Sequence, residues 1–253
     1  MAEGFLKGII EEKAREVKGL LGRSFPPPPQ PPPSFLEALK EGDPPRIIAE
    51  IKRRSPSKGN LRDLDPKEQA KRYEAGGARA ISVLTDGNFG GRPEDLKEVR
   101  SVTSLPLLRK DFILDPLQLE ESLSLGASAV LIISRILPEG RLKAMVERAM
   151  ELGLEPLIEV HTPEELKRAL ETPARTIGIN ARDLSTFQVD LGRVEELASM
   201  VPRDKILVAE SGIRKAEDIR RLMAVGVENF LVGEALVLSE DPVRKLKELR
   251  FLW

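Results

Sequence analysis

A short apolar run, a polar loop and an amphipathic helical stretch recur in that order along the chain, and this repeat constrains the fold more than any other feature. The apolar runs lie at residues 47–51, 80–84, 105–108, 129–133, 156–160, 176–179, 206–209 and 229–232. Strands that alternate with helices at this spacing pair in parallel through right-handed crossovers. Eight such units therefore predict an α/β protein with a closed (β/α)8 TIM barrel over residues 46–253.

An open, doubly wound sheet is the main alternative, because it also alternates strands with helices. Such sheets bind dinucleotides through a glycine-rich loop after the first strand, and no loop of this kind follows residue 51. Helix starts between the apolar runs carry capping signals, namely Asp65 before Pro66, Asp115 before Pro116 and Thr162 before Pro163. The repeat therefore favours the closed barrel.

Residues 1–45 differ from the rest and predict an N-terminal helical extension. Over residues 5–21 an apolar face recurs at helical spacing, made of Phe5, Ile9, Ile10, Ala14, Val17 and Leu21. Residues 26–33 are proline except for Gln30, which predicts a stiff spacer or, alternatively, a ligand for a proline-binding partner. Ser34 then caps a short helix over residues 34–40. We expect the extension and the barrel to form one structural domain.

Composition limits the chemistry that this chain can perform. Forty basic and forty-one acidic residues give a net charge of -1, which does not favour nucleic acid or an anionic membrane as a partner. The absence of cysteine excludes thiolate catalysis and cysteine-ligated metals. A single histidine, His161, excludes multi-histidine zinc sites and disfavours a serine-histidine triad. Acid and base chemistry must rest on Asp, Glu and Lys.

The chain also predicts a cellular setting. Glu3 and Lys7 interrupt the first turns, so no apolar secretory signal begins the chain, and no apolar run approaches membrane-spanning length. We therefore expect a cytoplasmic protein that is a monomer or a weak homo-oligomer. Charged residues at 32%, twenty prolines and no cysteine suit a thermostable protein from a heat-adapted source.

Charged and polar residues stand where the predicted strands end. They are Glu50 and Lys52, Arg109 and Lys110, Glu159, Asn180 and Arg182, and Glu210 and Ser211. Functional groups of such barrels lie at the carboxyl ends of the strands. The period of two along a strand puts Lys110, Glu159 and Glu210 on the same faces as apolar residues, so we expect them to converge over the barrel mouth. For Glu50 and Lys52 taken alone, a structural ion pair is the alternative.

Glycines after the last two apolar runs predict an anion site. Gly212 follows the run at residues 206–209, and Gly233 follows the run at residues 229–232. Glycine lets backbone N–H groups and a short helix approach a phosphate closely at this end of a barrel.

These residues together resemble the indole-3-glycerol phosphate synthase family, enzymes of tryptophan biosynthesis. The ordered motifs are Ala49-Glu50-Ile51-Lys52, Ser55-Pro56-Ser57-Lys58-Gly59, Leu84-Thr85-Asp86 with Phe89 and Gly91, Leu108-Arg109-Lys110-Asp111-Phe112, Glu159-Val160-His161, Gly178-Ile179-Asn180 with Arg182-Asp183-Leu184, Ala209-Glu210-Ser211-Gly212-Ile213 and Leu231-Val232-Gly233-Glu234. The resemblance implies a carboxy-lyase that uses no cofactor and no metal. Its substrate would be a phosphosugar with an anthranilate moiety, 1-(2-carboxyphenylamino)-1-deoxyribulose 5-phosphate, which loses carbon dioxide and water as the ring closes.

The resemblance also implies roles for individual residues. Lys110 would be the general acid that protonates the ketone oxygen. Lys52 would hold the substrate carboxylate and serve as an acid in dehydration, with Glu159 as its proton-transfer partner. Glu50 and Glu210 would orient the lysines and the sugar hydroxyls, and Asn180 would bind the reacting oxygen. The implied substrate contacts are Ser55, Phe89, Phe112, Leu131, Arg182 and Ser211, and the implied phosphate contacts are Gly212, Gly233 and Glu234.

Physical chemistry adds expectations about the surroundings of these groups. A lysine crowded by cations loses its proton more readily than one in water, and we expect Arg109, Arg182 and Lys52 to crowd Lys110 in this way. The two phenylalanines, Leu131 and Ile133 would form an apolar slot for the benzene ring, although Leu131 and Ile133 also suit ordinary barrel core. For His161 we expect a surface or helix-entry position rather than catalysis.

Two residues depart from the family pattern. Glu234 stands where a small hydroxyl residue is common, and a carboxylate would repel a phosphate, so either its side chain turns outward or the site is weaker. Arg92 follows Gly91 where a serine is common, which affects only a loop.

Three other functions stay open at this point. Phosphoribosylanthranilate isomerase has the same fold and substrate class, but its cysteine base has no counterpart here. A Schiff-base aldolase would use Lys52 or Lys110 as a nucleophile on a phosphosugar. A non-catalytic barrel would only bind.

Overall fold

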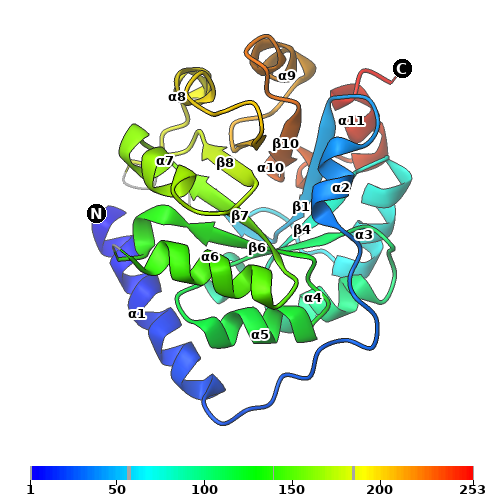
Figure 1. The fold of residues 1–253 in the computed structure, drawn as a ribbon. Helices are drawn as coiled ribbons and strands as arrows, with labels where there is room; N and C mark the ends of the chain where they lie inside the picture. The colour runs from blue at the N-terminus through cyan, green and yellow to red at the C-terminus, as the bar shows by residue number, and fades with distance from the viewer. Residues whose placement is uncertain (1, 56–57, 139, 184–185, 253) are drawn as a thin grey trace.

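A closed barrel of eight parallel strands forms the centre of the molecule (Figure 1). The computed structural model describes residues 2–55, 58–138, 140–183 and 186–252, and within them the strand order is β1-β10-β9-β8-β7-β6-β5-β4. The barrel strands are β1 (Arg46–Ile51), β4 (Ala80–Leu84), β5 (Leu107–Lys110), β6 (Ala129–Ile133), β7 (Glu155–Val160), β8 (Thr176–Asn180), β9 (Ile206–Glu210) and β10 (Asn229–Val232). The predicted closed barrel is confirmed, and the open sheet is excluded.

Helices surround the barrel, and short elements occupy its loops. The outer helices are α3 (Pro66–Ala75), α4 (Pro93–Arg100), α5 (Pro116–Ser124), α6 (Arg141–Glu151), α7 (Pro163–Leu170), α8 (Leu191–Ala198), α9 (Ala216–Met223) and α11 (Pro242–Leu249). The loop elements are β2 (Arg54–Ser55), β3 (Gly59–Asn60), the 3-10 turns η1 (Gly87–Phe89) and η2 (Ser134–Ile136), and α10 (Glu234–Val237). Asp65, Asp115 and Thr162 accept hydrogen bonds from the first turns of α3, α5 and α7, as the capping signals predicted.

The third predicted strand is displaced along the chain. We expected residues 105–108, whereas β5 is Leu107–Lys110. Pro106 has no N–H to donate, and its carbonyl accepts the N–H of Ile81, so regular pairing begins only at Leu107 opposite Ile81. The predicted strand therefore began two residues too early and ended two residues too early. Lys110 is the last residue of β5 and does not follow it.

The two faces of the strands pack into two separate apolar clusters. The inward residues of the barrel include Ile48, Ala80, Leu108, Ala129, Leu131, Leu157, Val208 and Leu231. Their neighbours along the strands, such as Ile47 and Val83, pack with the surrounding helices in a larger cluster. The alternation follows the period of two, and the inner cluster forms an apolar floor beneath the carboxyl ends of the strands.

The N-terminal extension contacts both ends of the barrel. Helix α1 (Ala2–Leu20) and helix α2 (Phe35–Lys40) lie on opposite sides of the molecule in Figure 1, and the proline-rich segment runs round the outside between them. Ser34 caps α2 and also donates to Glu155 at the start of β7, at 2.8 Å. Phe35 and Leu39 join the inner cluster. Helix α2 therefore closes the amino end of the barrel.

The buried face of α1 differs in part from the predicted one. Ile9 is buried as expected, whereas Ala14 is exposed and Leu21 is 67% exposed beyond the end of the helix. The expectation was wrong for those two residues, because the buried stripe runs through their neighbours Lys13, 2% exposed, and Leu20, 8% exposed. The side chain of Phe5 lies outside the described part of the structure.

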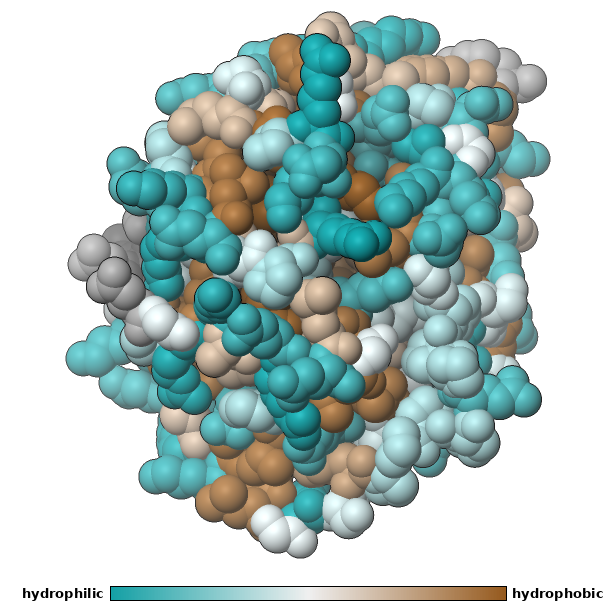
Figure 2. Space-filling view, in the orientation of Figure 1, coloured by the Kyte–Doolittle hydropathy of each residue, from teal (hydrophilic) through white to brown (hydrophobic). Residues whose placement is uncertain are grey.

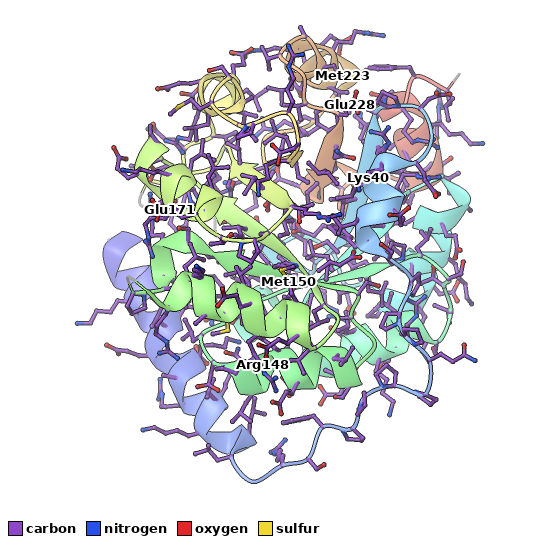
Figure 3. All side chains as sticks on the ribbon, viewed as in Figure 1. Lys40, Arg148, Met150, Glu171, Met223 and Glu228 are labelled. Carbon is purple, nitrogen blue, oxygen red and sulfur yellow. The ribbon has the colours of Figure 1, made fainter. Side chains whose placement is uncertain are left out.

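The outer surface is largely hydrophilic in the face shown by Figure 2, with apolar side chains in small separate patches. Arg148 of α6, labelled in Figure 3, pairs with Glu120 of α5 and with Glu151. Glu228, also labelled, pairs with Arg46 at the start of β1. The exposed pairs of Arg148 contribute about 0–1 kcal/mol each. None of the helices in the described ranges is long and apolar enough to cross a membrane.

Replacing Ser34 by alanine should lower the free energy of unfolding by about 1–2 kcal/mol, because one hydroxyl both caps α2 and binds Glu155. Urea unfolding measures the change, and kcat should stay at the wild-type value because α2 lies at the far end of the barrel from the mouth. Ser24→Ala on the exposed connection is the matched control and should change stability by less than about 0.5 kcal/mol. Equal stability of the two variants would contradict the closing role of α2.

Candidate active site

A pocket opens at the carboxyl ends of the barrel strands. It is lined by every residue that the sequence nominated for the site, namely Glu50, Lys52, Ser55, Phe89, Lys110, Phe112, Leu131, Glu159, Asn180, Arg182, Glu210, Ser211, Gly212, Gly233 and Glu234. Their position follows from the alternation of the strands, since Glu50, Lys110 and Glu159 each lie two residues beyond an inward apolar residue. The structure brings these residues together, while their individual roles stay predictions.

Lys110 lies among carboxylates at the centre of the pocket. Its Nζ is 3.3 Å from Glu159 Oε2 and 3.5 Å from Glu210 Oε2. Burial by itself would lower the pKa of Lys110, but Glu159, Glu210 and Glu50 outweigh burial and raise the pKa above its ordinary value. The amine therefore carries its proton at neutral pH.

This result corrects the expectation that cations crowd Lys110. Arg109 points to the outer face of the barrel, where its guanidinium binds Glu121 of α5 at 2.7 Å and Asp111 at 3.2 Å. Adjacent residues of a strand face opposite ways, so Arg109 and Lys110 cannot share the pocket. The expected lowering of the pKa of Lys110 was wrong in direction.

The two carboxyl groups beside Lys110 differ in protonation. Burial raises the pKa of Glu159, but Lys110 and His161 outweigh burial, and the pKa lies below its ordinary value. Burial raises the pKa of Glu210 to about 8, and Lys110 opposes this rise while Glu159 and Glu50 add to it. At neutral pH one carboxylate is therefore ionised beside one neutral carboxylic acid, an arrangement that separates proton acceptor from proton donor.

The second lysine forms its own pair at the mouth. Lys52 Nζ lies 2.7 Å from Glu50 Oε1, so in the free protein Lys52 pairs with Glu50, and Glu159 pairs with Lys110. A side chain at Gly233 would collide with both Glu50 and Lys52. Glycine at that position therefore leaves room for the ion pair at the end of β10.

Asn180 is held in one orientation. Its Oδ1 accepts the backbone N–H of Arg182 at 3.0 Å, which leaves the side-chain amide to donate to Glu159. Asn180 is 6% exposed at the end of β8. Its amide therefore faces the carboxylate that is paired with Lys110.

An apolar slot forms part of the pocket lining. The rings of Phe89 and Phe112 stack with centroids 6.3 Å apart and an angle of 26° between planes. Leu131 and Ile133 lie in the same inner cluster as these rings, so they belong both to the barrel core and to the pocket lining. A flat aromatic group fits such a slot.

The loops after β9 and β10 form the polar end of the pocket. Ser211 has φ 65° and Gly212 has φ 80°, so two consecutive residues adopt the left-handed conformation that serine rarely takes. Strained backbone of this kind is concentrated at functional sites. Across the mouth, Ser55 accepts the N–H of Lys58, and Lys58 Nζ binds Glu234 Oε1 at 2.7 Å. Glu234 therefore does not turn outward, and its charge is paired.

Comparisons with known proteins fit this geometry. A model of the family "Indole-3-glycerol phosphate synthase" matches residues 7–249. The chain belongs to that family.

Relatives and solved structures agree with the family match. The indole-3-glycerol phosphate synthase of Aquifex aeolicus is 51% identical over 208 residues, which cover 81% of this chain and 80% of that protein. The one of Leifsonia xyli is 48% identical over 253 residues, covering 96% and 95%. The thiamine phosphate pyrophosphorylase of Pyrococcus furiosus shares the fold alone, with a TM-score of 0.63, 19% identity, and coverage of 82% of this chain and 95% of that chain.

Lys13 of α1 is a residue that sequence reasoning missed. Its Nζ lies 2.9 Å from Asp86, 2.9 Å from Asp111 and 2.6 Å from Glu16. Burial lowers the pKa of Lys13, but Asp111 and Asp86 outweigh burial and raise it. Asp86 and Asp111 begin the loops that carry the two stacked phenylalanines. A lysine at the i+4 position from Ile9 in an apolar stripe was the available signal.

His161 also differs from expectation. It directly precedes Thr162, the N-cap of α7, so it stands at a helix entry as expected, but it is 3% exposed and not on the surface. Pro56, Ser57 and Leu184 of the family motifs lie outside the described residues.

The raised pKa of Glu210 makes stability depend on pH. Between its ordinary pKa of 4.5 and about 8, the folded chain binds a proton that the unfolded chain has released. The free energy of unfolding therefore falls as pH rises through this window. The glutamine of Glu210→Gln cannot ionise, so the free energy of unfolding of the variant should not fall in this window. Relative to the wild type it should therefore rise with pH, by ~1–4 kcal/mol at the upper end. Urea unfolding across and beyond the window measures the gap.

Glu196→Gln, on the exposed face of α8, is the control for this variant and should follow the wild-type pH curve. A constant difference between Glu210→Gln and wild type at all pH values would contradict the raised pKa.

Proposed function

We propose that this pocket converts 1-(2-carboxyphenylamino)-1-deoxyribulose 5-phosphate to indole-3-glycerol phosphate, with Lys110 as the general acid. One observation carries the proposal: Lys110 Nζ, on a side chain that is 17% exposed, lies 3.3 Å from Glu159 Oε2 and 3.5 Å from Glu210 Oε2, beside an aromatic slot. Ring closure puts negative charge on the former ketone oxygen as the aromatic carbon attacks. Lys110 Nζ gives its proton to that oxygen, which becomes a hydroxyl group.

The remaining steps need a second acid and a base. Lys52, which pairs with Glu50 at 2.7 Å in the free protein, holds the substrate carboxylate until carbon dioxide leaves and then protonates the departing hydroxyl. Glu159 is ionised and accepts the proton that is lost as the ring becomes aromatic. Asn180 donates to Glu159 in the free protein and binds the reacting oxygen in the proposed reaction. Each proton therefore has a named donor or acceptor.

The two ends of the pocket orient the substrate. The apolar slot, which Phe89, Phe112 and Leu131 line together, accepts the anthranilate ring. The backbone at Ser211, Gly212 and Gly233 approaches the phosphate, and Arg182 adds positive charge at this end. Ser55 supports the loop that carries Lys58.

The N-terminal extension belongs to the same working unit in this proposal. Leu6 and Ile9 of α1 line the pocket, and Lys13 binds two barrel loops. We therefore propose that residues 1–45 and the barrel of residues 46–253 act as one structural domain. We also expect a cytoplasmic enzyme, monomeric or weakly homo-oligomeric, that needs no cofactor or metal, with neither nucleic acid nor a membrane as partner.

The charge around Lys110 argues against a Schiff-base aldolase that uses this residue. A nucleophilic amine must lose its proton, and lysines in that role usually have a lowered pKa. Carboxylates raise the pKa of Lys110 instead. General acid catalysis is thus favoured over covalent catalysis.

Replacing Lys110 by alanine should reduce kcat by about 10²- to 10⁴-fold, the usual contribution of one general acid. Formation of indole-3-glycerol phosphate is followed by its indole fluorescence, and circular dichroism checks the fold. Lys143→Ala, on the exposed side of α6, should keep wild-type activity. Unchanged turnover in the folded Lys110 variant would remove Lys110 from the mechanism.

Glu234→Ser should lower KM for the phosphorylated substrate by roughly two- to tenfold. The substitution removes a repulsion of ~1 kcal/mol between the Glu234 carboxylate and the phosphate, and it releases Lys58 from its ion pair. Steady-state kinetics measure this effect, which should shrink at high salt because the groups are partly exposed. Glu240→Ser, on the exposed loop after α10, is the control. A higher KM in Glu234→Ser would mean that Glu234 helps binding by positioning Lys58.

A further inference from the structure

Glu159 divides its two carboxylate oxygens between a lysine and a histidine. Oε2 lies 3.3 Å from Lys110 Nζ, and Oε1 lies 3.3 Å from Nε2 of His161. His161 is the only histidine of the chain, and its side chain is 1% exposed. The proposed reaction uses Lys110 and Glu159 but gives this buried ring no role.

The ring is held firmly on its other edge. Nδ1 of His161 lies 3.2 Å from Glu165 Oε2, and the same oxygen accepts the backbone N–H of His161 at 2.7 Å. Glu165 is itself fixed by Arg135, whose Nε donates to Oε1 at 2.8 Å. Because Glu165 is anchored by α7 and Arg135, the imidazole has a fixed plane and a fixed edge toward Glu159.

The Nε2 edge of this ring has one acidic neighbour. Among the described residues, Nε2 makes no aligned hydrogen bond. The carboxylate oxygen within ion-pair distance of Nε2 is Glu159 Oε1, whereas Glu165 lies beside Nδ1 on the other edge of the ring. A buried ring nitrogen without an aligned partner is costly, and a small rotation of the Glu159 carboxylate would align the contact. A charged or neutral Nε2–H suits an ionised acceptor, whereas a bare nitrogen would repel it.

We propose that His161 is a positioning residue for the catalytic pair: its Nε2–H donates to Glu159 Oε1, which leaves Oε2 on Lys110 and keeps Glu159 ionised as a proton acceptor. This inference rests on the proposed function of Glu159. Charged and polar groups face Glu159 and His161 from two sides. On the side of the barrel mouth they are Lys110 on β5, Glu50 on β1, Asn180 on β8 and Glu210 on β9. On the side of the surrounding helices they are Glu165 on α7 and Arg135 on η2.

The proposal fixes the direction of a pH effect. Glu159 must be ionised to accept a proton, so activity is lost as pH falls through the pKa of Glu159. Lys110 and His161 both lower that pKa against the effect of burial. Without His161 the pKa rises, and the acid limb of the kcat profile moves to higher pH.

Two substitutions separate positioning from packing. His161→Leu fills similar space without a donor, whereas His161→Gln keeps an N–H that can reach Glu159. For His161→Leu we expect kcat at neutral pH to fall about ten- to a hundredfold, the equivalent of one hydrogen bond to a charged group, while KM stays within about threefold. The acid limb should move up by about one pH unit. His161→Gln should recover part of both changes.

Glu164→Gln is the control. It removes an exposed carboxylate from α7, the helix that also carries Glu165, and should behave as wild type. Melting temperatures measured in parallel report any packing defect. A His161→Leu enzyme with an unmoved acid limb would overturn the proposal, whether or not its stability and kcat fall. Equal kinetics of the Leu and Gln variants would also overturn it.

A spectroscopic test needs no turnover and no folded His161 variant. In protein labelled with 15N-histidine, the single histidine gives one pair of ring nitrogen signals. We expect Nε2 to carry a proton at neutral pH, and its signal to shift in Glu159→Gln. A bare Nε2 with the proton on Nδ1, or an unchanged Nε2 signal in Glu159→Gln, would refute the contact. If the wild type made no indole-3-glycerol phosphate, the proposed function would fail while this readout stayed interpretable.

Discussion

The attraction between one lysine and three carboxyl groups at the barrel mouth is the interaction on which the rest of the site depends. An isolated charge in this buried position would be costly, so the Lys110 amine persists as a cation only because Glu159, Glu210 and Glu50 surround it. The same crowding separates the two nearest carboxyl groups into an ionised and a neutral form. Four strands must supply these groups at one level, which a closed parallel barrel does and an open sheet does not.

A glycine and a second buried ion pair shape the space around this cluster. Gly178 on β8 has no side chain because a Cβ there would collide with Glu210. Lys13 joins α1 to the loops that carry Phe89 and Phe112. The aromatic slot is therefore set by a buried ion pair between the extension and the barrel, so the extension helps to define the shape of the pocket.

Much of this arrangement was predictable from the sequence, because a strand has a period of two and a barrel has one functional end. Those two rules placed Lys110, Glu159 and Glu210 together without knowledge of any coordinate. The same rule, applied to Arg109, would have sent it outward, and its contact with α5 shows that the expected crowding of Lys110 by cations ignored the alternation. The sequence shows Arg109 and Lys110 only as two adjacent cations. The side chains must be assigned to opposite faces of the strand before the two can be told apart.

Other features could not be read from local pattern. The burial of Lys13 depends on Asp86 and Asp111, which lie far along the chain, and the burial of His161 depends on Glu159 in front of it and Glu165 behind it. The start of β5 depends on which residue first pairs with β4. For Lys13 and for the start of β5 a long-range partner decides, whereas propensity and periodicity describe only the chain's own neighbourhood. The partners of His161 are near in sequence, but their contact with the ring depends on how the end of β7 meets the start of α7.

The most direct measurement of the central claim is an NMR titration of the Lys110 amine in protein labelled with 15N at lysine Nζ, with Lys110→Met to assign the signal. The account predicts that this amine stays protonated above its ordinary pKa of 10.5, because carboxylates surround it. An amine that loses its proton below that value would contradict the account.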